Sequence, residues 1–261
     1  MKDNKIHPTA IIEEGARIDS TVEIGPYAVI KSGVEIGAGT TVDAHAVIEG
    51  NTIIGKNNTI GIGVVIGNRP QDLKYKDEET HVTIGDGNII REYVTINRGT
   101  IERGVTSLGN NIMLMSYVHI AHDCIVGDEV ILANCVTLAG HVTIEDQAVI
   151  GGLTPIHQFT RIGKLSIIGG SSRVPKDILP YCMAAGNRLK ITGLNTIGLK
   201  RRNFSAEDRS QLKKAYRIIF RSGLNTAQAV EKMKSMQELT SPHVTRMIQF
   251  IETSERGIYK S

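Results

Sequence analysis

Residues 18–42 read IDSTVEIGPYAVIKSGVEIGAGTTV, and a branched aliphatic residue returns at every sixth position of this stretch. The same step runs from Ile6 to Ile66 with isoleucine or valine at each position, resumes at Ile84 and continues with one gap to Val174. A period of six matches neither the roughly 3.6 residues of a helical turn nor the alternation of a half-buried strand. It is typical of a solenoid in which each hexapeptide forms one short strand and one turn. We therefore expect an all-β parallel β-helix, a hexapeptide-repeat solenoid, with about 18 residues in each three-sided coil.

Two stretches interrupt the repeat. Residues 67–83 and 100–107 are polar and charged and lack the inward aliphatic residues, so we expect them to be loops that leave the coil at its corners. Loops on a rigid scaffold often carry binding and catalytic residues. Tolerated insertions without a role are the alternative for both.

The repeat ends after Val174, and helical spacing of apolar residues appears further on. We predict a β-helix domain over residues 1–187 and, over residues 188–261, a connecting segment followed by a small C-terminal α-helical domain. Capping signals mark where two of its helices begin. Ser205 begins a capping-box pattern, and Ser241 precedes a proline that suits the first turn of a helix. A third helix is expected over 226–237.

Charge is distributed unevenly along the chain. Residues 188–261 hold 15 Lys and Arg against 6 Asp and Glu, a balance of +9, whereas the preceding residues hold 15 against 21, a balance of −6. A basic tail on an acidic body indicates an anionic partner, with a simple solvated helix surface as the alternative.

Composition also restricts where the protein works. The first residues contain no apolar signal-peptide core, and no stretch approaches the roughly 18 apolar residues of a membrane span. The three cysteines show no C-x-x-C spacing, which favours reduced thiols. We therefore expect a cytoplasmic protein without a transmembrane segment.

A cluster of polar residues stands out within residues 117–141, YVHIAHDCIVGDEVILANCVTLAGH. Residues about 18 apart should lie above one another at the roughly 4.8 Å spacing of paired strands. This rule places six residues on three successive coils at one corner: His122, Asp123, Gly140, His141, His157 and Gln158.

A neutral histidine suits general-base catalysis because its pKa lies near 6.5, and a glycine can offer an uncovered backbone N–H to an oxyanion. Two alternatives remain open from the residues alone. The histidines are ordinary polar surface, or His119 and His122 form a zinc site together with a third histidine. Zinc hydratases of this architecture space their histidines differently, and we predict no metal here.

Five ordered motifs resemble one enzyme family over the whole chain. They are IAHDC at 120–124, LAGH at 138–141, HQF at 157–159, PQDLKY at 70–75 and GLKRR at 198–202. Together they are similar to the UDP-N-acetylglucosamine O-acyltransferases that begin lipid A synthesis. Members of this family move a 3-hydroxyacyl chain from acyl carrier protein to the glucosamine 3-OH of UDP-N-acetylglucosamine. The resemblance implies a left-handed coil, a homotrimer with clefts between subunits, no cofactor and no nucleic-acid partner.

The resemblance also implies a role for individual residues. His122 is expected to be the general base, with Asp123 orienting it and the Gly140 amide stabilising the oxyanion. The remaining family positions are substrate contacts: Asp72 and Lys74 for the sugar and acyl portions, His119, His141, His157 and Gln158 around the cleft, and Asn195 and Arg202 for the nucleotide. Gly170 occupies the position that sets acyl length, and its missing side chain implies a longer chain than in members with a bulky residue there.

The sequence departs from the family pattern at a few positions. Asn97 stands where the string T-I-H-R-G-T has histidine, Ile197 occupies a position that is often acidic, and residues 76–79 replace a glycine-containing loop. These changes leave the preference between a 3-hydroxyl and a 3-amino sugar open. The basic tail is expected either to dock acyl carrier protein or to serve the UDP phosphates.

Overall fold

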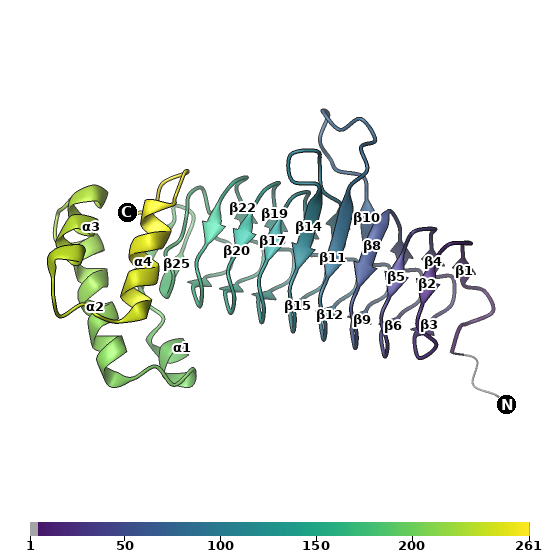
Figure 1. Ribbon diagram of the computed structural model, residues 1–261, viewed down its shortest axis with the longest axis horizontal. Coiled ribbons are helices and arrows are strands. Elements are labelled where there is room, and N and C mark those ends of the chain that lie inside the picture. The colour runs from purple at the N-terminus through teal and green to yellow at the C-terminus, as the bar shows by residue number, and fades with distance from the viewer. Residues whose placement is uncertain (1–4, 261) are drawn as a thin grey trace.

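A computed structural model of the protein describes residues 5–260 and shows a long three-sided parallel β-helix that ends in a helical region (Figure 1). Each side of the coil is one sheet. The first sheet has eight strands in the order β1 (Ile11–Ile12), β4 (Val29–Ile30), β7 (Val47–Ile48), β10 (Val65–Asn68), β13 (Thr95–Asn97), β16 (His119–Ile120), β19 (Thr137–Leu138) and β22 (Pro155–Ile156). The second has β2 (Arg17–Ile18), β5 (Glu35–Ile36), β8 (Asn51–Ile54), β11 (His81–Ile84), β14 (Val105–Leu108), β17 (Ile125–Val126), β20 (Thr143–Ile144) and β23 (Arg161–Ile162).

The third sheet is the longest and reaches the C-terminal end of the coil. Its ten strands are β3 (Glu23–Ile24), β6 (Thr41–Val42), β9 (Thr59–Ile60), β12 (Ile89–Ile90), β15 (Met113–Leu114), β18 (Ile131–Leu132), β21 (Val149–Ile150), β24 (Ile167–Ile168), β25 (Cys182–Ala185) and β26 (Lys190–Leu194). All pairings in the three sheets are parallel except that of β25 with β26. The predicted all-β parallel helix is therefore the architecture of the chain up to β24.

The six-residue rhythm supplies the core. From Ile24 to Val174, the aliphatic residue at each step is buried inside the coil. Ile6 is 41% exposed because it lies on the first described coil, where only one neighbouring coil covers it. Burial of these side chains from every coil creates one continuous apolar column along the molecule.

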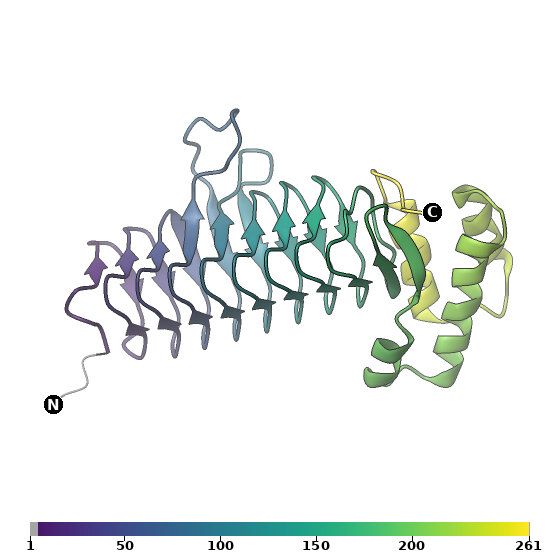
Figure 2. The same ribbon diagram turned by 180° about the vertical axis from the view of Figure 1, so that it is seen from behind.

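Both interruptions of the repeat are loops, but each is shorter than the sequence predicts. The first runs from residue 69 to 80, since β11 already pairs with β8 at His81, and the second runs from residue 98 to 104, since β14 begins at Val105. The residues at the edges of both stretches pair as strands because pairing satisfies their backbone N–H and C=O groups. Both loops join the first sheet to the second, so they leave the coil at the same corner, as Figures 1 and 2 show.

The C-terminal end caps the coil with helices. They are α1 (Thr196–Arg201), α2 (Ala206–Arg221), α3 (Thr226–Ser235) and α4 (Pro242–Glu252). Ser205 and Ser241 cap α2 and α4 as predicted. The segment predicted as a plain connection instead forms the β25–β26 hairpin and α1. No helix among residues 5–260 combines the length and apolar character needed to cross a membrane.

A ladder of buried asparagines satisfies amides that the flat strands leave unpaired. The side-chain oxygen of Asn58 accepts from the Asn88 amide at 2.8 Å, and that of Asn88 accepts from the Ile112 amide at 2.8 Å. The Asn88 side-chain nitrogen donates to the Gly109 carbonyl at 3.1 Å. Asn88 therefore links three successive coils, through its backbone amide to the coil before and through its side chain to the coil after.

We predict that Asn88→Leu lowers the melting temperature. It leaves the Ile112 N–H and the Gly109 carbonyl without this partner inside the coil, at a cost of roughly 1–3 kcal/mol for each group. Thermal unfolding followed by circular dichroism measures the change. The matched control is Asn134→Leu at an exposed corner position, which should leave the melting temperature nearly unchanged. Equal effects of the two substitutions would contradict the role of the ladder.

Candidate functional site

The predicted histidine cluster occupies the turns that join the first sheet to the second. We call residues 122–123, 140–141 and 158–159 the histidine corner. Backbone hydrogen bonds stack its turns: His141 N donates to the His122 carbonyl at 3.0 Å, and Phe159 N donates to the Gly140 carbonyl at 3.2 Å. The second residue of each turn has φ near +60°, which directs successive side chains out of the same corner. The stacking rule read from the sequence is confirmed here.

His122 and Asp123 form a hydrogen-bonded pair at this corner. His122 Nδ1 lies 2.8 Å from Asp123 Oδ2, and the Asp123 side chain is fully buried. Burial by itself raises the pKa of Asp123, but hydrogen bonds from His122 and Thr100 outweigh it and hold that pKa below its usual value. The ionised carboxylate therefore accepts a hydrogen bond from the Nδ1–H of His122, which leaves the lone pair of that ring on Nε2.

Gly140 makes room for the His122 ring. A Cβ atom at residue 140 would stand 2.5 Å from His122 Cε1 and 2.7 Å from Nε2. The φ angle of Gly140 lies outside the left-handed region, so the backbone itself does not demand glycine. The glycine is needed because the imidazole lies against it, which places the Nε2 atom beside the residue predicted as oxyanion donor.

His141 is held by contacts on several sides. Its ring stacks on Phe159 with 4.5 Å between centroids and meets His122 edge-on at 5.1 Å. Its Nε2 lies 3.3 Å from Glu102 Oε2 and 3.6 Å from Asp123 Oδ2. Burial lowers the pKa of His141, an effect that the Asp123 charge partly offsets. A neutral imidazole at neutral pH follows.

The other predicted corner residues are more open or more distant. His119 projects from β16, and its Nδ1 lies 2.7 Å from Thr95 Oγ1. Burial, and then the neighbouring His122, lower the pKa of His119. His157 and Gln158 are both exposed on the coil after Gly140. All of them border the same corner.

Asp72 and Lys74 lie in the first loop, two coils before His122 and at the same corner. The Asp72 carboxylate accepts from the Lys74 amide at 2.9 Å, which shapes the loop locally. Arg98 anchors the loop to the coil, since its Nε donates to Tyr75 Oη at 3.0 Å. No hydrogen bond between described residues joins Asp72 or Lys74 directly to the histidines.

Asn195 and Arg202 lie at a different corner. They border a groove of about 440 Å³ between α1 and the outer face of the third sheet. Arg202 pairs with Glu129 at 2.6 Å. Asn195 is buried and caps α1, with its side-chain oxygen accepting from Gly198 N at 2.9 Å and its nitrogen donating to the Leu165 carbonyl at 2.9 Å. Its side chain therefore holds the wall of the groove.

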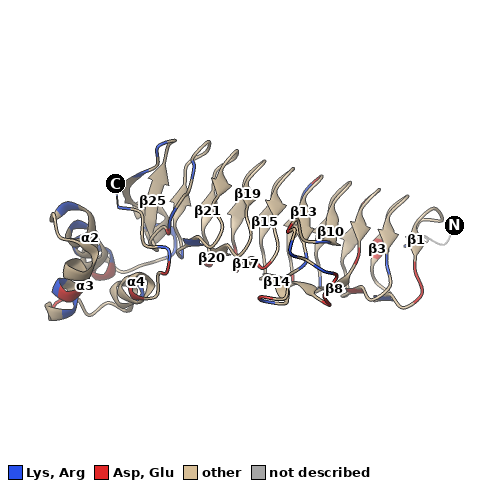
Figure 3. Cartoon of the chain, turned by 90° about the horizontal axis from the view of Figure 1, so that it is seen from above, with Lys and Arg blue, Asp and Glu red and all other residues tan. Residues whose placement is uncertain are grey.

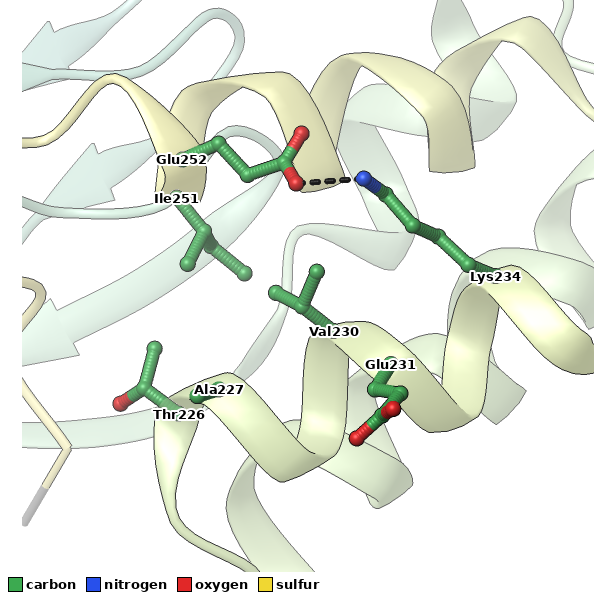
Figure 4. A pocket seen from close by; sticks show the side chains of 7 residues that line it. All are labelled: Thr226, Ala227, Val230, Glu231, Lys234, Ile251 and Glu252. Carbon is green, nitrogen blue, oxygen red and sulfur yellow. Dashed lines mark hydrogen bonds and ion pairs between the residues drawn. The ribbon is translucent and has the colours of Figure 1, made fainter.

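Gly170 occupies the third corner, between the third and first sheets. A Cβ atom there would stand 3.2 Å from the Gly152 carbonyl oxygen, so a larger residue needs a small adjustment of the coil. Figure 4 shows a separate hollow between α3 and α4. It is lined by Val230 and Ile251 among others, the Lys234–Glu252 ion pair lies at its edge, and none of the predicted site residues lines it.

Comparison with known proteins connects this geometry to a family. Residues 177–259 match the family model described as Udp N-acetylglucosamine O-acyltransferase, Domain 2, and residues 106–140 match Bacterial transferase hexapeptide (six repeats). An acyl-[acyl-carrier-protein]–UDP-N-acetylglucosamine O-acyltransferase from Burkholderia orbicola is 48% identical over 98% of this chain and 99% of its own. This chain belongs to the UDP-N-acetylglucosamine O-acyltransferase family.

Solved structures of family members have the same shape. LpxA from Acinetobacter baumannii superimposes with a TM-score of 0.96 at 45% identity and covers 98% of this chain and 100% of its own. The Arabidopsis UDP-N-acetylglucosamine acyltransferase gives 0.86 at 36% identity over 98% of this chain and 100% of its own. The predicted left-handed parallel β-helix with C-terminal helices is confirmed. The acyltransferase class is confirmed as well, in place of a zinc hydratase.

One group of side chains resembles a metal site within this acyltransferase. Ligand atoms of His122, Asp123 and His141 lie within 4.8 Å of one another, the one such group of three among residues 5–260. The Asp123 oxygens, however, already accept hydrogen bonds from Thr100 and His122. Both oxygens of the carboxylate are therefore engaged within the protein.

Sequence reasoning missed Thr100 and Glu102. Both lie in the second loop and contact the histidine corner, Thr100 at Asp123 and Glu102 at His141. The repeat shows that a loop leaves the coil here, because the aliphatic step is broken. It does not show that the loop folds back on Asp123, since a loop carries no repeating spacing.

Proposed function

We propose that the protein transfers a 3-hydroxyacyl chain from acyl carrier protein to the glucosamine 3-OH of UDP-N-acetylglucosamine, in the cytoplasm and as the first step of lipid A synthesis. The names of full-length relatives at 48% identity support this reaction. The observation that carries the mechanism is the His122–Asp123 pair with Nε2 beside Gly140.

The proposed chemistry is one direct transfer. His122 Nε2 removes the proton of the sugar 3-OH as its oxygen attacks the thioester carbonyl. The buried Asp123 carboxylate keeps Nδ1 protonated and stabilises the imidazolium that forms. The new C–O bond forms, the C–S bond breaks, and the imidazolium returns its proton to the leaving thiolate. No acyl-enzyme and no cofactor take part.

The Gly140 N–H is the proposed oxyanion donor. No acceptor among residues 5–260 pairs with it, and the absent side chain leaves it uncovered. A preorganised backbone donor at this point stabilises the charge that develops on the thioester oxygen. Base and donor thus come from adjacent coils of one corner.

The complete site is proposed to form between protomers of a homotrimer. The histidine corner and the groove that holds Asn195 and Arg202 lie at different corners of one coil, separated by the second sheet. Gly170 lies at the third corner. A neighbouring protomer that presents its Arg202 groove to the histidine corner unites base and nucleotide contacts, with the guanidinium supplying a planar charge for phosphate.

The basic C-terminal region is proposed to dock the carrier protein. Figure 3 shows Lys and Arg along α2 and α3. Their positive balance complements an acidic carrier protein, and electrostatic attraction of this kind raises the association rate at low salt. Asp72 and Lys74, on the loop beside the histidine corner, are proposed to hold the sugar and acyl portions, with His119, His141, His157 and Gln158 around them.

The test is a transfer assay with purified 3-hydroxyacyl carrier proteins of several chain lengths. UDP-N-acetylglucosamine and its 3-amino analogue serve as acceptors. We expect saturable acyl transfer to the 3-hydroxyl sugar, with a longer preferred chain for the natural Gly170 than for Gly170→Met. Carrier proteins with unsubstituted acyl chains are the matched control donors. Failure of every 3-hydroxyacyl donor would contradict the proposal.

A further inference from the structure

The second loop binds the buried carboxylate of Asp123. The Thr100 N–H donates to Asp123 Oδ1 at 2.9 Å, and the Thr100 hydroxyl donates to Oδ2 at 2.6 Å. Thr100 is 6% exposed and Asp123 is 0% exposed, so these bonds are shielded from water. Two donors from one residue, one on each oxygen, fix the plane of the carboxylate.

Oδ2 of Asp123 has two competing histidine partners. His122 Nδ1 lies 2.8 Å away and His141 Nε2 lies 3.6 Å away. An ionised carboxylate that is free to rotate will pair with either ring, because both imidazoles offer a nitrogen within about the range of an ion pair. Only the first pairing leaves Nε2 of His122 as the base.

We propose that Thr100 is a positioning residue that commits Asp123 to His122 rather than to His141. This rests on the proposed role of His122 as general base. The Thr100 hydroxyl holds Asp123 Oδ2 in contact with His122. Glu102, from the same loop, lies 3.3 Å from His141 Nε2 and gives His141 another carboxylate partner. The second loop therefore assigns each histidine its own carboxylate, Asp123 to His122 and Glu102 to His141.

The loop is built to hold Thr100 in place. Gly104 N donates to the Thr100 carbonyl at 2.6 Å, and His81 N donates to the Gly104 carbonyl at 2.8 Å, so the loop closes on itself and on β11. At the neck of the loop, a Cβ on Gly99 would stand 2.3 Å from Val105 N. In β14, just beyond the loop, Thr106 Oγ1 accepts a hydrogen bond from the Asp123 N–H at 2.8 Å. Asp123 is thus held both by the loop and by the strand that follows it.

The test compares Thr100→Val with Thr100→Ser in the full chain. The valine keeps the shape and removes the hydroxyl, so we expect kcat to fall about 10- to 100-fold, as for partners of a reacting residue, with KM for UDP-N-acetylglucosamine within about threefold. The serine should restore kcat to within about threefold. The matched control is Thr80→Val, since the Thr80 hydroxyl is buried without a hydrogen-bond partner.

A double-mutant cycle separates positioning from a structural role. In an Asp123→Asn background, Thr100→Val should change kcat less than about twofold, because the carboxylate it positions is gone. If Thr100→Val does not fold, Thr100→Ala, which adds no bulk, replaces it in the cycle. Full turnover of the Thr100 variant, or equal losses with and without Asp123, would overturn the proposal. An active His122→Ala enzyme would instead overturn the general-base assignment on which it rests.

Discussion

His122→Ala is expected to lower kcat by about 10²- to 10⁴-fold or more, the scale of general-base catalysis. Nε2 of this residue carries the lone pair because Nδ1 faces the Asp123 carboxylate at 2.8 Å. The side chain is 13% exposed and projects from a corner turn, so its removal leaves the aliphatic column inside the coil untouched. Turnover with a 3-hydroxyacyl carrier protein and UDP-N-acetylglucosamine measures the loss.

The control for this variant is His7→Ala. His7 is an exposed histidine on the first described coil, far along the chain from the histidine corner, and its loss should leave kcat unchanged. Binding of UDP-N-acetylglucosamine to His122→Ala should persist, because a base that acts on the reacting proton contributes little to ground-state affinity. A His122→Ala enzyme with turnover within about tenfold of the natural one would exclude His122 as the base.

Gly140→Ala should lower kcat about 10²- to 10³-fold, the scale for losing one oxyanion donor. The new methyl group would stand 2.5 Å from His122 Cε1, so the imidazole must swing away from its place and Nε2 moves with it. The methyl group also partly covers the backbone N–H. The melting temperature should change little, because the ring is the free end of a side chain and can move where a backbone atom cannot.

Gly140→Ala in a His122→Ala background is the matched control. Without the ring, the methyl group has the space that the imidazole vacated. The double variant should therefore match His122→Ala in melting temperature, and any further drop in its residual turnover measures the effect of the methyl group on the N–H of residue 140. A large drop in stability from Gly140→Ala in either background would show that the glycine serves the coil rather than the site.

The sequence is sufficient to predict the coil because the spacing of its aliphatic residues follows from the geometry of the repeat. Outside the two loops, each sixth residue from Ile24 to Val174 enters the core, and the same period gives the stacking of His122 under Gly140 and of Asp123 under His141. In a repeating structure, the number of residues between two positions predicts whether they lie above one another. Capping serines likewise marked helix starts at Ser205 and Ser241.

The conformations of the second loop and of the connecting segment cannot be predicted from the sequence, for a physical reason. The contacts of Thr100 with Asp123 depend on how the second loop folds back, and tertiary contacts decide that. The β25–β26 hairpin forms because β24 offers an open strand edge for pairing. The sequence of the hairpin alone does not show that this edge lies beside it. Asn195 and Arg202 are identified by family resemblance alone, and because they lie outside the repeat, its spacing does not reveal that they are at a different corner from His122.

The hairpin at the end of the coil also determines how long the molecule is. Parallel coils leave their last strand with unpaired amides and carbonyls, which is a template for adding further strands. β26 runs antiparallel to β25 and so breaks the pattern on which another coil would stack. The C-terminal segment then returns to the coil, where Tyr259 N donates to the Asp177 carbonyl at 2.8 Å. The repeat is thereby terminated, and growth into end-to-end filaments is disfavoured.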